Sequence, residues 1–569
     1  MALFSALFFL LLLGRLGYIQ LVKNSKLTEE AVQQRALTML LNHNRGDILD
    51  CNGISLLAGS EERVLVVFPS FLHHGAGVTE RVSAYLPPAA TAGTMGMPFI
   101  ARRGLDEQEE DVFKELQKAG LLVVSSRQRY GPEALATHVI GHTGPSDGEG
   151  KVGLEFTFND ILGSAPPTVL AAVIDNKKNL IDGLGYRLWG KDEIHKPFDL
   201  VLTIDSRIQK KVEEIMDSRL VRGAVVIMDP SNGDILAMAS RPNYLQVGLP
   251  SYLNGAERQE DFLDSQPFIN RSILSYPPGS VFKIVVAAAA LDSGKAALYQ
   301  SFYCPGYIRV GEQIFHCRHG PHGELSLPEA FAHSCNVAFI KLAQDLGKET
   351  VYEYAIALGL GRATGVPLGS ADQGGEASGA IPCPEEMLYG GDLALTAIGQ
   401  GRVEATPLQI ACLTATVANG GFLVKPRLVK ALQTKPGLLF YEYALASPRK
   451  VLKASTASKL RYMMRGVVEY GTGNTAFGST LLLGGKTGTA ETKRFLQGKP
   501  LVYAWFTGCV PLEDCRAVVT VLIEEPRQGG AAAAFKEIAQ AIAPFWDADG
   551  FEPAKDSPSL WELIGKEPG

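Results

Sequence analysis

The sequence predicts an α+β fold in which an antiparallel sheet carries a helical subdomain. Apolar strands are expected at 224–228, 235–238, 481–485, 502–507 and 517–523. The turn after the first strand contains Pro230, Asn232 and Gly233, which are typical turn residues. A mostly helical region is expected from 280 to about 416. Strands at both ends of one domain, with helices between them, are typical of the α+β class.

Length and charge limit the classes of protein that need to be considered. A chain of 569 residues is too long for one core, so we expect two or more domains. The formal net charge is −6 and no basic run is visible, which argues against a nucleic-acid partner. Eight cysteines in a chain of this length do not form a disulfide scaffold.

The N-terminal stretch is uncharged and almost wholly apolar from Met1 to Leu13, and Arg15 follows. Its helix would cover about 20 Å of a bilayer core that is about 30 Å thick. Continuing to Val22 reaches spanning length, although it includes Arg15, which can extend toward a membrane surface. No clear signal-peptide cleavage site follows Leu13. We therefore expect residues 1–22 to be a membrane anchor whose cytoplasmic end is truncated in this sequence.

Residues 22–41 are polar and mildly helical, and residues 60–195 alternate short strands, glycine and proline turns and one amphipathic helix, expected from about 106 to 119. Asn52-Gly53, between apolar residues, predicts a hairpin turn. The region offers no pair of nucleophile and base, so we interpret it as a structural module. The second domain is expected over 196–548, and the polar tail over 549–569 is expected to be loose.

The stretch around Ser280 is the first candidate for catalysis. Two prolines and a glycine precede it, and 281–291 predicts a buried, alanine-rich helix that ends near Gly294. Ser280 would lie in the first turn, where unpaired N–H groups favour developing negative charge. Lys283 lies one turn further on the same face. Because apolar residues flank it, we expect a lowered pKa that lets its amine act as a base.

Two further segments of the sequence contain residues that could contribute to a catalytic site. Ser334 and Asn336 lie between two predicted helices, the first of which begins at Ser326 with the spacing of a capping box. Taken alone, both residues would be ordinary helix caps.

The apolar run 481–485 leads into Lys486, Thr487, Gly488 and Thr489. A buried strand would place this lysine at its end, and Gly488 would let a ligand or another backbone approach closely. Taken alone, this piece would be an ordinary strand end.

The three pieces in this order are the motif combination of β-lactamases and penicillin-binding proteins. The chain resembles a class B penicillin-binding protein, a membrane-anchored peptidoglycan D,D-transpeptidase, over nearly its whole length. Further residues that carry the resemblance include Arg45-Gly46, Gly153-Leu154-Glu155, Asp229-Pro230, Gly399-Gln400-Gly401, Gly471-Thr472-Gly473 and Trp505-Phe506-Thr507-Gly508. The resemblance implies a non-catalytic pedestal or dimerisation domain over 23–195. It also implies a penicillin-binding transpeptidase domain of the serine β-lactamase-like fold over 196–548.

The resemblance also implies the roles of the catalytic residues. Ser280 would attack the carbonyl between the two D-alanines of a stem peptide, and Lys283 would accept its proton. Ser334 would pass a proton toward the leaving D-alanine. Asn336 would hold the Lys283 amine and the substrate's amide. An amine of a neighbouring strand would then attack the acyl-enzyme and form the cross-link.

The substrate ends in a carboxylate, and by resemblance Lys486, Thr487 and Thr489 would bind it, with Gly488 between them. Backbone N–H groups of Ser280 and Thr489 would form the oxyanion hole. A β-lactam would acylate Ser280 stably. The implied reaction requires no metal or organic cofactor.

The implied location is the cell membrane, with a single span and an extracytoplasmic catalytic domain. The implied partners are peptidoglycan stem peptides, β-lactams and a SEDS-type glycosyltransferase that contacts the anchor and pedestal. Two other functions stay open. One is a D,D-carboxypeptidase or β-lactamase-like hydrolase, and the other is a non-catalytic penicillin sensor or scaffold.

Cys304 and Cys317 flank the stretch 307–315, which predicts a hairpin that turns at Gly311-Glu312. The two thiols would then lie nearly opposite each other. Three interpretations stay open: a disulfide in an oxidising exterior, a metal site, or free thiols in a surface loop. Histidines that could complete a metal site are His316, His319 and His322.

Overall fold

The chain forms two compact units in the computed structural model. The described residues are 2–23, 34–72, 96–114, 116–117, 120–145, 147–177, 179–181, 183–190, 196–219, 222–249, 266–370, 374–434, 437–478, 481–496, 499–525 and 530–547. Unit 1 comprises 1–46, 59–131 and 160–198, and unit 2 comprises 47–58, 132–159 and 199–569. Two short stretches that precede residue 196 thus belong to unit 2. The expected tail, 549–569, lies outside the described residues.

The N-terminal stretch forms the α-helix α1 (Ala2–Gly17), which continues into a short π-helix, η1 (Tyr18–Val22). The expected helix is therefore present. No helix in the described ranges reaches both the length and the hydropathy of a membrane span.

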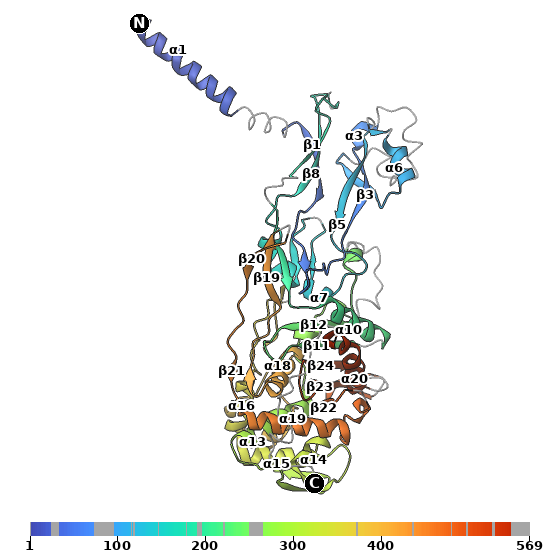
Figure 1. The fold of residues 1–569 in the computed structure, drawn as a ribbon, viewed down its shortest axis with the longest axis vertical. Coiled ribbons are helices and arrows are strands. Elements are labelled where there is room, and N and C mark those ends of the chain that lie inside the picture. Colours follow the sequence, from blue (N-terminus) through green and yellow to red (C-terminus); the bar gives the residue numbers. More distant parts are fainter. Residues whose placement is uncertain are drawn as a thin grey trace. The chain divides into compact units, whose positions relative to one another are not determined.

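Unit 1 contains two three-stranded antiparallel sheets (Figure 1). The first has the strand order β1 (Ala36–Asn42), β8 (Thr168–Val173) and β9 (Tyr186–Trp189). The second has the order β4 (Phe99–Arg103), β3 (Ser60–Val67) and β5 (Leu121–Gln128). The short helix α3 (Pro69–Leu72) follows β3. The helix α6 (Glu107–Lys114) is shorter than the expected 106–119.

Alternation along β3 builds two apolar layers in unit 1. Val64 and Val66 pack with Leu170 of β8, whereas Leu65 and Val67 pack with Phe113 of α6. Successive side chains of a strand point to opposite faces, so one strand can serve both layers. Hydrophobic burial on the two faces therefore holds α6 and the β1–β8–β9 sheet to the same strand.

Unit 2 is built on a five-stranded sheet with the order β12-β11-β24-β23-β22, and every neighbouring pair is antiparallel. Its strands are β11 (Arg222–Met228), β12 (Ile235–Arg241), β22 (Gly484–Leu496), β23 (Lys499–Val510) and β24 (Ala517–Glu524). The expected antiparallel sheet is confirmed. The strand expected at 481–485 is displaced, because β22 begins at Gly484 and continues past Lys486.

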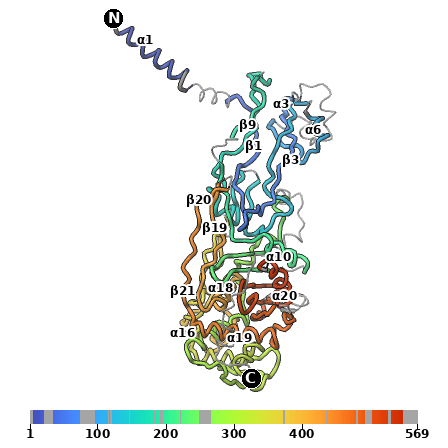
Figure 2. The backbone as a smooth tube through the Cα atoms, viewed as in Figure 1, coloured from blue at the N-terminus to red at the C-terminus, as the bar shows by residue number. Residues whose placement is uncertain are grey.

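One face of this sheet is covered by α10 (Ser206–Ser218) and α20 (Gly530–Ile542), which lie side by side although they are far apart in the sequence (Figure 2). Asp205 caps α10 by accepting a hydrogen bond from the N–H of Arg207 at 2.9 Å. The apolar stripes of both helices, represented by Val212 and Phe535, pack on Val225 and Val521 of the sheet.

The other face carries a helical layer. Its helices are α13 (Lys283–Asp292), α14 (Leu327–Ala332), α15 (Asn336–Leu346), α16 (Lys348–Ala357), α17 (Gly390–Ala397), α18 (Pro407–Ala418) and α19 (Ala454–Glu469). Figure 1 shows α13, α14 and α15 gathered at one end of the unit, beside α19. Trp505 and Leu522 of the sheet join the same core as these helices. The α+β expectation is thus confirmed.

Smaller sheets complete unit 2. One has the order β2 (Ile48–Leu49), β10 (Asp199–Leu202), β19 (Val429–Thr434) and β20 (Leu438–Glu442), and another joins β6 (His142–Thr143), β7 (Gly150–Val152) and β17 (Gly369–Ser370). The remaining pairs are β13 (Ser301–Cys304) with β16 (Gly323–Ser326), β14 (Tyr307–Val310) with β15 (Gln313–His316), and β18 (Phe422–Leu423) with β21 (Arg449–Lys450).

The chain turns at Asn52-Gly53 as expected. Gly53 has φ +84°, and its N–H donates to the carbonyl of Asp50 at 3.1 Å. A single antiparallel bridge joins Leu49 and Ser55 across the turn.

Candidate active site

Ser280 lies in a 3-10 turn, η6 (Gly279–Phe282), that leads directly into α13. The expected helix over 281–291 is thus present, although its first turn is tighter than an α-helix. Every residue from Val281 to Ala290 has a fully buried side chain, including Lys283. Ser280 is half-buried. Apart from the buried Lys283, the residues from Val281 to Ala290 are apolar, so Ser280 is the polar side chain of this element that can meet a ligand.

The turn that carries Ser280 is held from several sides. Gly279 has φ +56°, and a Cβ there would lie 2.5 Å from the carbonyl oxygen of Thr489, so only glycine fits. The Gly279 N–H donates to the carbonyl of Gly399 at 2.9 Å. The indole N–H of Trp505 donates to the carbonyl of Pro277 at 3.0 Å. These contacts place Ser280 beside β22.

The turn between α14 and α15 carries Ser334 and Asn336. The expected capping box of Ser326 and Glu329 begins α14 and is confirmed. Ser334 has φ +56°, a left-handed conformation that is uncommon for a residue with a side chain. Asn336 is the first residue of α15. The turn thus presents two polar side chains at the junction of two helices, as expected.

The Lys283 amine is the centre of the hydrogen-bond network. Its Nζ donates to the Ser334 carbonyl at 2.6 Å, to the Ser334 hydroxyl at 3.1 Å and to Asn336 Oδ1 at 2.7 Å. The Asn336 amide donates in turn to the carbonyl of His316 at 2.8 Å. Three acceptors hold the amine in position: the ammonium form can bond all three, and the neutral form bonds two of them and keeps a lone pair that can accept a proton.

Lys486 lies inside β22 rather than at the end of a strand, which corrects the sequence-based placement. Its side chain is fully buried, and Nζ donates to the Ser334 hydroxyl at 3.2 Å and to the Thr487 carbonyl at 3.1 Å. The ring of Phe331 lies 5.5 Å from Nζ, within cation–π range. The Ser334 hydroxyl therefore accepts from the amines of both Lys283 and Lys486.

Burial is the main cause of the lowered pKa values of Lys283 and Lys486. It lowers the pKa of Lys283 to about 7, against a smaller opposing effect of Cys335 and Cys317. Burial, and then the charge of Lys283, also lower the pKa of Lys486 well below the usual range of a lysine. A neutral Lys283 amine is a base that is available near neutral pH.

The candidate active site contains one cleft of about 790 Å³. Among the residues that line it are Ser280, Ser334, Asn336, Thr472, Thr487, Gly488, Thr489 and Trp505. The three predicted pieces, which are far apart in the sequence, thus meet in one place. As expected, Gly488 allows a close approach, since a Cβ there would lie 2.7 Å from the carbonyl of Pro278.

Several neighbours had no role in the sequence-based interpretation. The hydroxyl of Thr472 bonds that of Thr487 at 2.5 Å, and the carbonyl of His316 orients Asn336. Thr472 and Trp505 lie in motifs that carried the family resemblance, so a signal for them existed. The contact of His316 is made by its backbone, for which side-chain chemistry offers no signal.

The hairpin of β14 and β15 is confirmed, and it brings Cys304 and Cys317 together with an Sγ–Sγ distance of 3.6 Å. Cys335, between Ser334 and Asn336, joins them, with 3.8 Å between its Sγ and that of Cys317. All three are free thiols in the structure. His322 completes the group, whereas His316 and His319 are not part of it.

A family model and two curated relatives match this chain. Residues 223–543 match the model of the penicillin binding protein transpeptidase domain. Stage V sporulation protein D of Bacillus subtilis is 29% identical, over 92% of this chain and 81% of its own length. Peptidoglycan D,D-transpeptidase MrdA of Acinetobacter baumannii is 27% identical, over 94% and 85%.

Solved structures show the same fold. The D,D-transpeptidase domain of a peptidoglycan glycosyltransferase from Eggerthella lenta superposes with a TM-score of 0.64 at 24% identity, covering 89% of this chain and 99% of that chain. Penicillin binding protein 3 of Mycobacterium tuberculosis, complexed with aztreonam, superposes with a TM-score of 0.63 at 24% identity, covering 92% and 99%.

Proposed function

Because the chain belongs to the penicillin-binding protein transpeptidase family, we propose that Ser280 is the nucleophile with which it cross-links peptidoglycan stem peptides. The protein is a serine-type peptidoglycan D,D-transpeptidase of cell-wall synthesis. The observation that carries the residue assignment is the Lys283 amine. It is buried and held by Ser334 and Asn336, in the same turn of chain as Ser280 and beneath the cleft.

Acylation begins with the Ser280 hydroxyl. Lys283, neutral because it is buried, accepts the hydroxyl proton while the oxygen attacks the carbonyl between the two D-alanines. The peptide bond breaks, and a proton returns to the leaving amine of D-alanine. We assign this transfer to Ser334; the hydrogen bonds of its hydroxyl to the amines of both Lys283 and Lys486 support the assignment.

The acyl-enzyme is then resolved by an amine of a neighbouring strand. That amine attacks the ester carbonyl, loses its proton to the same Lys283 and Ser334 network, and Ser280 leaves with its hydroxyl restored. The side-chain amide of Asn336 orients the donor peptide at the edge of the cleft. Its Oδ1 meanwhile keeps the Lys283 amine in place.

Substrate charge and the oxyanion are assigned to β22 and the turn before α13. Thr487 and Thr489 line the cleft and are assigned to the terminal carboxylate. Lys486 is assigned as the cation for that charge, because an arriving carboxylate favours the charged form of the amine, which burial and Lys283 disfavour in its absence. The N–H groups of Ser280 and Thr489 are assigned to the oxyanion hole. In another acyl-transfer enzyme, removing one such donor raises the activation barrier by about 2.7–4 kcal/mol.

A β-lactam resembles the D-alanyl-D-alanine end and acylates Ser280 without being released. The two solved structures of Mycobacterium tuberculosis penicillin binding protein 3 with aztreonam and with ampicillin support this part of the proposal.

The rest of the chain is assigned a supporting role. Residues 1–22 are the anchor that places a single-pass protein at the cell membrane, with the catalytic domain outside. The apolar composition of α1 supports this assignment. Residues 23–195 are the pedestal, and a SEDS-type glycosyltransferase is the partner that contacts anchor and pedestal and polymerises the strands.

The proposal is tested with fluorescent penicillin and with a stem-peptide donor. Wild type, Ser280→Ala and Lys283→Ala are labelled side by side. Ser293→Ala and Lys295→Ala are the matched controls, because they alter the same residue types just beyond the far end of α13. We expect no labelling of Ser280→Ala, strongly reduced labelling of Lys283→Ala, and normal labelling of both controls.

Labelling of Ser280→Ala equal to that of wild type would contradict the assignment of the nucleophile. Product analysis then separates transfer from hydrolysis. With acceptor peptide and glycosyltransferase partner supplied, cross-linked product is expected. Release of D-alanine without any cross-linked product would instead show a carboxypeptidase, and labelling without turnover would show a sensor.

A further inference from the structure

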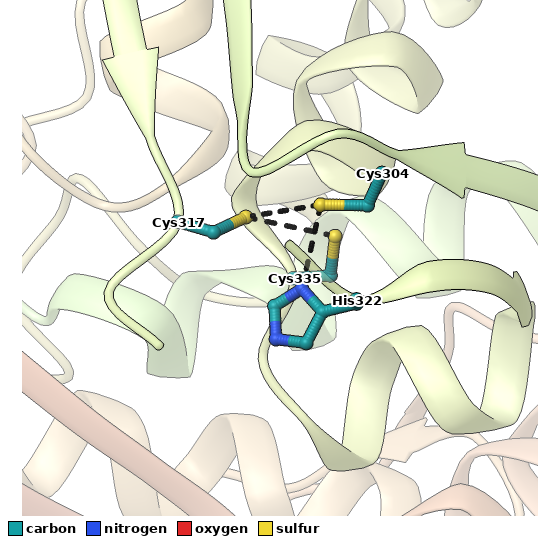
Figure 3. A group of neighbouring side chains, drawn as sticks. All are labelled: Cys304, Cys317, His322 and Cys335. Carbon is teal, nitrogen blue, oxygen red and sulfur yellow. Dashed lines mark hydrogen bonds between the residues drawn. The ribbon is translucent and has the colours of Figure 1, made fainter. Parts of the chain in front are cut away.

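Four potential metal ligands converge on one point (Figure 3), and one of them, Cys335, lies between Ser334 and Asn336. Cys304 ends β13, Cys317 follows β15, His322 precedes β16, and Cys335 is the cap of α15. The three cysteines are buried and the histidine is half-buried. We propose that Cys304, Cys317, Cys335 and His322 bind one zinc ion as a structural site. This inference goes beyond the transpeptidase chemistry and does not depend on it.

The distances fit a tetrahedral ion. Sγ of Cys317 lies 3.6 Å from that of Cys304 and 3.8 Å from that of Cys335, and Sγ of Cys304 lies 3.4 Å from Nδ1 of His322. All four ligand atoms lie within 4.8 Å of one another. A tetrahedron with Zn–S bonds of about 2.3 Å and a Zn–N bond of about 2.0–2.1 Å has ligand atoms about 3.6–3.8 Å apart. Small shifts of the side chains therefore suffice to bind the ion.

The composition of the cluster selects the metal. Soft thiolate ligands favour zinc over hard cations such as Mg²⁺ and Ca²⁺, and three cysteines with one histidine are a common set for a closed structural zinc site. A disulfide would use only two of the three thiols and would leave the third buried beside it. A metal uses all three sulfur atoms and also explains why the ring nitrogen of His322 points at them (Figure 3).

The ion would position the catalytic turn. Cys335 lies between Ser334, whose φ is +56°, and Asn336, which bonds Lys283. Cys317 follows His316, whose carbonyl accepts from Asn336. Zinc bound to Cys335 and Cys317 would thus link the turn that contains Asn336 to the segment that contains His316. The distance between these two segments determines where the Asn336 side chain lies. Cys304, Cys335 and His322 do not line the cleft, and Cys317 does so beside His316; we assign all four ligands as positioning residues.

The direct test is metal content of the full chain, purified without chelator and measured by mass spectrometry. We expect about one zinc per chain, as for a structural site of four ligands. We expect loss of zinc in Cys304→Ser and in His322→Ala. The controls are Cys412→Ser, a buried cysteine on α18, and His319→Ala, an exposed histidine near the cluster, and both should keep the ion.

Two measurements on wild type keep the inference testable even where a variant does not fold. Replacement of zinc by Co²⁺ should produce thiolate-to-cobalt charge-transfer absorption and the visible bands of a tetrahedral ion. Titration in denaturant with chelator and without reductant should find all 8 thiols. Protein without stoichiometric zinc, stoichiometric iron or copper in its place, or two thiols that appear only after reduction would overturn the zinc site.

A functional measurement shows what the ion does. Chelation should lower the rate of acylation by fluorescent penicillin, and added zinc should restore it. A zinc-containing protein that does not acylate would contradict the proposed function and leave the metal site intact. A protein that acylates but never contains zinc would contradict the metal site and leave the proposed function intact.

Discussion

Replacing Asn336 by alanine tests whether the position of the Lys283 amine limits acylation. The change removes the Oδ1 acceptor 2.7 Å from Nζ and the donor to the His316 carbonyl, while both Ser334 oxygens remain. The Lys283 amine gains charge as it accepts the Ser280 proton, and a hydrogen bond to a charged group contributes about 1.5–3 kcal/mol, which corresponds to roughly 10- to 150-fold in rate. We expect acylation of Ser280 to slow by that factor.

The assay is the second-order rate constant for labelling by fluorescent penicillin, measured together with urea unfolding. Asn419→Ala is the matched control, because it also removes hydrogen bonds to two carbonyls, those of Pro230 and Phe422, but lies outside the cleft. It should lose some stability and acylate at the wild-type rate. Wild-type acylation by a folded Asn336→Ala would refute the reasoning, because Lys283 would then hold its position without this acceptor.

Three further predictions follow from the same structure. Because burial lowers the pKa of Lys283 to about 7, the acylation rate should rise as pH increases through that value and then level off, since the neutral amine is the base; a rate that falls over this range would contradict the role of the lysine. Gly488→Ala would place a Cβ 2.7 Å from a backbone carbonyl, so it should abolish labelling and lower the free energy of unfolding by about 1–3 kcal/mol, whereas Gly96→Ala, which meets open space, should change neither. Arg271→Ala removes the fully buried cation 2.9 Å from Glu524, whose carboxylate keeps Arg222 at 2.6 Å and the Tyr276 hydroxyl at 2.8 Å, so urea unfolding should show a loss of about 1.5–3 kcal/mol, the contribution of a hydrogen bond to a charged group; an unchanged unfolding midpoint would show that the pair is not stabilising.

Local features of the fold were predicted well where a short-range interaction defines them. The capping box of Ser326 and Glu329 joins two residues three positions apart, and it begins α14 as expected. The turn at Asn52-Gly53 depends on one positive φ. The β14–β15 hairpin needs only its own turn and alternating side chains. In each case the residues that determine the element are neighbours in the chain.

Element ends and element type were predicted less well where packing decides them. The strand expected at 481–485 begins at Gly484 and continues through Lys486, because β22 pairs along β23 rather than ending after its apolar residues. The first turn of the Ser280 helix is 3-10, where Gly279 must pass the Thr489 carbonyl. The helix expected over 106–119 is the shorter α6.

Residue types and their spacing were sufficient to predict the α+β class, the motifs and the family resemblance. The tertiary structure alone decided that Lys486 is buried behind Ser334 and that Cys335 and His322 join the hairpin cysteines. The physical reason is that the environment of an amine or a thiol depends on what surrounds it. Segments far apart in the sequence build these surroundings, and no short-range pattern specifies which of them meet.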